Sequence, residues 1–100
     1  MVKHMIVWTL KSELTPEEKE FVKQGIKEGL EGLVGKVPGL LDLKVHINGL
    51  PTSNADLMLD STLDSFESLR GYSAHPEHVA VANGKVRPYT AVRSCLDFEL

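Results

Sequence analysis

Four stretches of this 100-residue chain have the patterning of β-strands. Residues 2–10 are rich in β-branched and large apolar types, which predicts a strand that is buried on both faces. Residues 41–47 alternate, so the second strand has a polar face, on which we expect His46 to be exposed, and an apolar face formed by Leu41, Leu43, Val45 and Ile47. Residues 56–60 and 89–98 predict the third and fourth strands, the last with Val92, Leu96 and Phe98 on one side.

Helical signals lie between these strands. Thr15 and Glu18 form a capping box, and Pro16 occupies the first helical position. The helix that follows has an apolar stripe with a period of about 3.6 residues, made of Val22, Ile26, Leu30 and Leu33 with Phe21 alongside. Three glycines (Gly25, Gly29 and Gly32) on a neighbouring face indicate either close approach of another backbone or simply a weak helix.

Two shorter helices are expected after the third strand. Ser65 or Asp64 can cap the first of them, which carries Phe66, Leu69 and Tyr72 at helical spacing. Pro76 begins the second, which we expect to run through about Val81 and to end near Asn83-Gly84.

The resulting order, β-α-β-β-α-β, is typical of α+β, ferredoxin-like folds with a four-stranded antiparallel sheet and helices on one face. The other face of such a sheet is bare. Residues 2–10 carry apolar side chains on both parities, so we expect the second face to be covered as well. Within one domain spanning residues 1–100, no segment is left to cover it, and a homodimer that stacks sheet on sheet is the economical solution.

Composition narrows the function classes. The chain is 42% hydrophobic and 25% charged, which is typical of a soluble globular domain. A net charge of −3 with dispersed basic residues disfavours nucleic-acid binding, and no apolar run is long enough to span a membrane. A cytoplasmic location is therefore expected. Cys95 is the one cysteine, which excludes an internal disulfide and suggests a buried, inert thiol.

The richest chemistry lies in residues 72–78, Tyr-Ser-Ala-His-Pro-Glu-His, in a chain with only four His and two Tyr. A neutral His78 within reach of an acidic C–H can act as a general base, and Tyr72 can polarise the adjacent carbonyl. In the alternative interpretation, His75 caps the helix, Tyr72 packs against the sheet, and His78 bonds a backbone carbonyl. The H-x-x-H spacing has no recognisable third ligand, so we expect no metal site and no cofactor.

Three further residues are candidates for a ligand site. His4 and Trp8 share one side of the first strand, where Trp8 either lines a pocket or fills the core. Arg87 either holds an anionic ligand or fastens its loop to a carboxylate. We include His75 among the candidate ligand-binding residues.

The chain resembles the Dabb family of stress-responsive dimeric α/β-barrel proteins. The motifs that carry the resemblance, which runs nearly end to end, are Val2-Lys-His-Met-Ile-Val-Trp8, Lys36-Val-Pro-Gly39, Tyr72-Ser-Ala-His-Pro-Glu-His78 and Val86-Arg-Pro-Tyr89. It implies a ferredoxin-like protomer and a homodimer whose two sheets form a barrel.

A branch of this family, the plant polyketide cyclases of the olivetolic acid type, implies roles for particular residues. His78 matches the general base, Tyr72 the assisting tyrosine and His4 a histidine of the pocket. Leu57 and Ile26 stand where that branch has a further His and a Tyr, so the same reaction is in doubt while a generic proton abstraction is not.

Two hypotheses follow. In the first, the chain binds a small apolar or carbonyl-containing molecule between sheet and helices, with proton transfer by His78, Tyr72 and His4. In the second, it is a non-catalytic structural or stress-associated dimer with a filled interior. A pocket above roughly 300 Å³ with converging polar groups favours the first.

Overall fold

The computed structural model describes residues 1–100 and has the expected ferredoxin-like architecture. Antiparallel pairing gives one sheet in the order β2-β3-β1-β4. The strands are β1 (Val2–Leu10), β2 (Leu40–His46), β3 (Leu57–Leu63) and β4 (Thr90–Glu99). The helices are α1 (Pro16–Glu31), α2 (Phe66–Ala74) and α3 (Pro76–Val81), and a π-helical turn, η1 (Ala82–Val86), continues α3.

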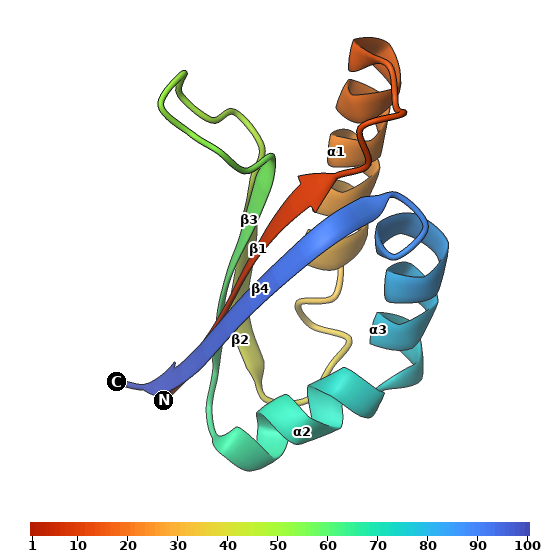
Figure 1. The fold of residues 1–100 in the computed structure, drawn as a ribbon. Coiled ribbons are helices and arrows are strands. Elements are labelled where there is room, and N and C mark those ends of the chain that lie inside the picture. Colours follow the sequence, from red (N-terminus) through yellow and green to blue (C-terminus); the bar gives the residue numbers. More distant parts are fainter.

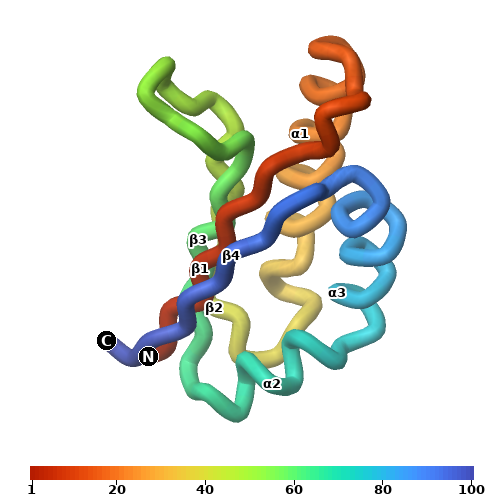
Figure 2. Tube along the Cα trace, viewed as in Figure 1, coloured from red at the N-terminus to blue at the C-terminus, as the bar shows by residue number.

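All the helices lie on one side of the sheet, and the opposite side is uncovered (Figure 1). A cluster of buried apolar side chains fills the space between the two layers. The chain ends lie together at one end of the sheet, where the Leu100 amide donates to the Met1 carbonyl at 3.0 Å. Beyond the other end, the loop between β2 and β3 extends away from α1 (Figure 2). No helix combines the length and apolar character needed to cross a membrane.

The prediction that the first strand is buried on both faces is wrong for the chain by itself. His4, Ile6 and Trp8 are buried under the helices, whereas Met5 is half-buried and Val7 is exposed on the opposite face. Val92, Leu96 and Phe98 share one side of β4 as predicted, and register places them on this same uncovered face. Alternate apolar residues of β1 therefore face two different surfaces, the core beneath the helices and the uncovered side of the sheet.

Helix α1 begins as the capping box predicts. The Glu18 amide donates to Thr15 Oγ1 at 3.1 Å, and the Thr15 amide donates to Glu18 Oε1 at 2.8 Å. Val22, Ile26 and Leu30 are buried, and Leu33 is buried in the turn after the helix. Phe21 does not join this stripe: its side chain is 82% exposed, because its position points away from the sheet.

Two other apolar residues also face solvent against expectation. Leu41 lies at a register shift between β2 and β3, which turns its side chain outward and leaves Leu40 buried in its place. Phe66 is the first residue of α2, and it is exposed while Leu69 and Tyr72 are buried. His46 is exposed, as predicted.

Helix α3 runs from Pro76 to Val81, as predicted, but Asn83-Gly84 do not end the helical path. The chain continues through these residues as η1, in which the Arg87 amide donates to the Ala82 carbonyl at 2.9 Å. This wider turn buries Ala82 and Val86 and leads directly into β4. As a result, Arg87 and the first residues of β4 border the space beneath the helices.

Candidate active site

A cavity of about 220 Å³ lies between the helix-covered face of the sheet and α3. Its floor is formed by β1 and its neighbours, and its walls by α2, α3, η1 and the start of β4. It is lined by His4, Ile6, Trp8, Leu30, Leu59, Tyr72, Ser73, His78, Ala82, Val86, Arg87, Thr90 and Arg93. The volume falls short of the roughly 300 Å³ expected of a ligand site, whereas the expected convergence of polar groups from several elements is present.

His78 reaches the cavity from the first turn of α3, where Pro76 starts the helix. Its Nδ1 lies 3.3 Å from the Ser73 carbonyl oxygen, so in the tautomer that donates this bond Nε2 keeps its lone pair. Burial lowers the pKa of His78 below its usual 6.5, and the positive charges of Arg87 and Arg93 act in the same direction. The imidazole is thus held in the neutral form that a base requires.

Tyr72 lies between the two histidines of the cavity. Its ring centroid is 4.3 Å from that of His78 and 5.9 Å from that of His4. The residue is only 1% exposed, and its hydroxyl has no hydrogen-bond partner within the protein. Burial raises the pKa of this phenol, so the hydroxyl keeps its proton and can donate it in a hydrogen bond.

His4 is oriented by a carboxylate that the sequence did not reveal. Register in the β1–β4 pair sets His4 opposite Asp97, and His4 Nδ1 lies 2.5 Å from Asp97 Oδ1. Such a bond fixes the ring and its tautomer, which leaves the other ring nitrogen for the cavity. The two residues are separated by 93 positions, so no local motif could have signalled the pair.

Cys95 is exposed, which contradicts the expected burial. It shares the helix-covered face of β4 with Asp97, in a stretch that helices only partly cover, and its Sγ lies 3.4 Å from Asp97 Oδ1. Desolvation and the neighbouring carboxylate raise the pKa of the thiol, so it is a poor nucleophile. With His4 these two residues form the one cluster of potential metal ligands, but Asp97 already accepts from His4.

The other candidates divide into two groups. Trp8 is 4% exposed and lines the cavity, as does Arg87, which donates to Asn83 Oδ1. His75 does not line the cavity; its Nδ1 accepts from the Glu77 amide at 3.1 Å and caps α3. Arg93 also lines the cavity and was missed, because only the β4 register shows that it lies opposite Trp8.

The positions that depart from the cyclase pattern, Ile26 and Leu57, are buried and do not line the cavity. Their aliphatic side chains belong to the core. The polar side chains around the cavity are therefore His4, Tyr72, His78 and the two arginines, with the smaller hydroxyls of Ser73 and Thr90.

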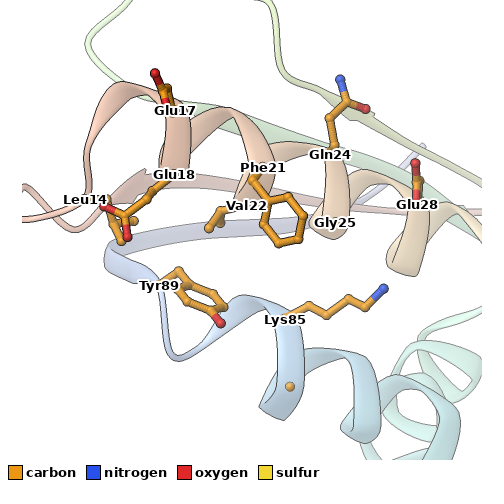
Figure 3. Close-up of a pocket in the computed structure, with 11 residues that line it drawn as sticks. Leu14, Glu17, Glu18, Phe21, Val22, Gln24, Gly25, Glu28, Lys85 and Tyr89 are labelled. Atoms are coloured by element: carbon orange, nitrogen blue, oxygen red, sulfur yellow. The ribbon is translucent and has the colours of Figure 1, made fainter.

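A second hollow is an open groove of about 720 Å³ between α1 and the segment that ends in Tyr89 (Figure 3). Figure 3 shows Phe21 extending from α1 toward Tyr89 and Lys85 on the opposite wall. Its ionisable groups are Glu17, Glu18, Glu28 and Lys85. No histidine or buried polar group faces it.

A family model, the stress-responsive A/B barrel domain (Dabb), matches residues 2–100. No curated protein matches the chain. A solved structure from Bacteroides fragilis, a dimeric protein of unknown function with a ferredoxin-like fold, has a TM-score of 0.92 and 30% identity, over 99% of this chain and 95% of that one.

Two further structures extend the comparison. A dimeric ferredoxin-like protein of unknown function from Thermobifida fusca has a TM-score of 0.79 and 26% identity, over 99% of this chain and 90% of that one. A hydroxynitrile lyase from Passiflora edulis has a TM-score of 0.77 and 17% identity, over 97% of this chain and 90% of that one. At that identity the plant enzyme shares the fold alone.

Proposed function

Because the chain belongs to the stress-responsive A/B barrel domain family, we propose that it acts as a homodimer that binds a small carbonyl compound in the cavity beneath its helices. His78 and Tyr72 then transfer a proton on the bound molecule without a cofactor, and His4 helps to position it. The hydroxynitrile lyase among the structures of this fold supports an enzymatic use of the scaffold.

The observation that carries this proposal is the unpartnered hydroxyl of Tyr72 beside His78. Leaving a buried hydroxyl without a partner costs about 1–3 kcal/mol, so such a group is usually satisfied. Here the hydroxyl belongs to a residue that lines a cavity, and the rings of Tyr72 and His78 are 4.3 Å apart. A ligand oxygen in the cavity would provide the missing acceptor.

The reaction that suits these groups is proton abstraction beside a carbonyl. His78 Nε2 takes the proton from the carbon, and the C–H electron pair forms the double bond of an enolate. The Tyr72 hydroxyl donates to the enolate oxygen as its charge develops. Return of the proton to another atom of the enolate completes an isomerisation, and return of a solvent-derived proton from His78 to the same carbon completes an exchange, with no external oxidant or reductant.

This activity can be tested by NMR-detected exchange of α-hydrogens for deuterium in D₂O, with phenylacetone and phenylpyruvate as probes. We expect the protein to accelerate the exchange and His78→Gln to reduce the acceleration by about 10²–10⁴-fold with folding retained. Arg70→Gln is the control and should leave the rate unchanged, because Arg70 is exposed on α2 and does not line the cavity. Exchange at the buffer rate with every probe would instead favour the non-catalytic dimer.

The dimer is supported by the uncovered sheet face and by the relatives described as dimeric. Large apolar residues are exposed there, on strands that pair with each other: Val7, Val92, Leu96 and Phe98. A sheet-on-sheet dimer would bury well over 1,200 Å² in total, which is typical of stable interfaces. We expect light scattering to give twice the monomer mass at micromolar concentration and Leu96→Asp to shift it to the monomer; a monomeric wild type would contradict this.

A further inference from the structure

The charge of the cavity is opposite to that of the whole chain. The sequence has 14 Asp and Glu against 11 Lys and Arg, yet the cavity lining contains two arginines, two histidines and no carboxylate. Neither Arg87 nor Arg93 takes part in any of the four ion pairs of the structure. Asp97, the nearest acidic group in the site, is bonded to His4 outside the lining.

Hydrogen-bonding capacity in the cavity is equally one-sided. A guanidinium only donates, and Arg87 uses one of its donors on Asn83. The Tyr72 hydroxyl keeps its proton and lacks a partner, so it is a further unused donor. Against these donors, the acceptors are few: one ring nitrogen of His78 once its Nδ1 donates to Ser73, the ring nitrogen of His4 that does not face Asp97, and the hydroxyls of Ser73 and Thr90. The complementary ligand is rich in acceptor oxygens and supplies one acidic hydrogen.

Apart from the hydroxyls of Ser73 and Thr90, the rest of the lining is apolar and includes Ile6, Leu30 and Leu59 together with Trp8. Arg93 lies directly across the β1–β4 pair from Trp8, so the guanidinium-bearing residue and the indole border the same part of the cavity. A ligand that fits both has an apolar body and an anionic end.

We propose that the ligand is an oxo acid with a small apolar side chain, whose carboxylate is held by Arg93 and Arg87. This inference rests on the proposed function and names its substrate class. Guanidinium groups bind carboxylates by paired, charge-assisted hydrogen bonds, which fix the orientation of the bound acid. With the carboxylate held at the arginines, the neighbouring carbonyl oxygen is directed to Tyr72 and the acidic C–H to His78.

Phenylpyruvate and its neutral amide separate charge from shape, because they have nearly the same size. Calorimetric titration of the intact protein should show that the acid binds at least about tenfold more tightly than the amide. The difference should shrink as salt is added, since both arginines are exposed. Equal binding of acid and amide would overturn the oxo-acid inference and leave the carbonyl site standing, whereas no binding of either would overturn both.

Substitution of one arginine tests the residue assignment. Arg93→Gln should weaken binding of the acid much more than binding of the amide and so remove most of the preference for the acid, while Arg93→Lys should keep part of that preference because the charge remains. Arg70→Gln is the matched control: Arg70 is exposed on α2 and does not line the cavity. An Arg93→Gln variant that folds like the wild type and keeps its full preference for the acid would refute the assignment.

Discussion

Of the two hollows of this protein, the groove is the larger, but the cavity contains the side chains suited to chemistry. The groove beside α1 holds about 720 Å³ and is open, whereas the cavity beneath the helices holds about 220 Å³. The groove brings together three glutamates and a lysine at its rim. The cavity brings together an imidazole with a lowered pKa, an unpartnered phenol and two arginines.

The side chains that line the groove either have a structural role elsewhere or make no enclosing contact. Glu18 closes the capping box of α1, and its hydrogen bonds to Thr15 lower the pKa of its carboxyl group. Phe21 is 82% exposed, so it offers an aromatic surface but encloses nothing. The difference indicates that convergence of unsatisfied polar groups, rather than volume, marks the site for chemistry.

Removing one hydroxyl from each hollow is the strongest test of whether the cavity or the groove is the active site. Tyr72→Phe should lower the α-hydrogen exchange rate about 10²-fold, because it deletes the donor to the enolate oxygen. The same change should raise the free energy of unfolding by about 1 kcal/mol, since it removes a buried hydroxyl without a partner. Exchange kinetics and urea unfolding of the one variant measure both effects.

Tyr89→Phe is the control from the groove, where Tyr89 is 36% exposed. It should leave the exchange rate unchanged and alter stability by less than about 0.5 kcal/mol. If the Tyr89 variant loses activity while the Tyr72 variant keeps it, the two hollows have been assigned the wrong way round.

Local sequence patterns predicted the fold well because its elements have local causes. The Thr15–Glu18 box starts α1, Ser65 caps α2 through the Ser68 amide, and Pro76 opens α3. The same patterns did not predict which strand residues the helices cover and which they leave exposed. Val7 and Leu96 were recognised as apolar strand residues, but only the helix layer shows that their face is left uncovered.

The site was predictable only as far as it lies on one short segment. Tyr72 and His78 are six residues apart, and their adjacency follows from two consecutive helices. Asp97 and Arg93 reach His4 and Trp8 through strand pairing between the two ends of the chain, which spacing cannot reveal. His75 lies between Tyr72 and His78 in the sequence, but it caps α3, as the alternative interpretation of this segment predicts, and does not line the cavity.

The pH dependence of the reaction tests whether His78, in the cavity, is the base. Burial lowers the folded-state pKa of His78 below 6.5, so the acid limb of the exchange rate should be centred below pH 6.5. Stability should fall in the same direction: as the pH drops below 6.5 the unfolded chain binds a proton that the folded His78 does not, and the free energy of unfolding declines. His78→Asn should remove this part of the decline. An acid limb centred above pH 6.5 would contradict a buried base.

The smallest expected effect comes from two glycines on α1, one lining the groove and one packed against α3. Gly25 lines the groove and has open space around its Cβ position, so Gly25→Ala should stabilise the protein by about 0.5–1 kcal/mol through helix propensity. At Gly29 an added Cβ would lie 2.9 Å from Val81 Cγ1 on α3, and that stiff side chain cannot move without its helix. Gly29→Ala should therefore forfeit this gain and, by displacing the helix that carries His78, slow the exchange reaction as well. Urea unfolding and exchange rates of the pair test this; equal stabilisation by both alanines would show that α3 adjusts freely and that the cavity is less rigid than its packing indicates.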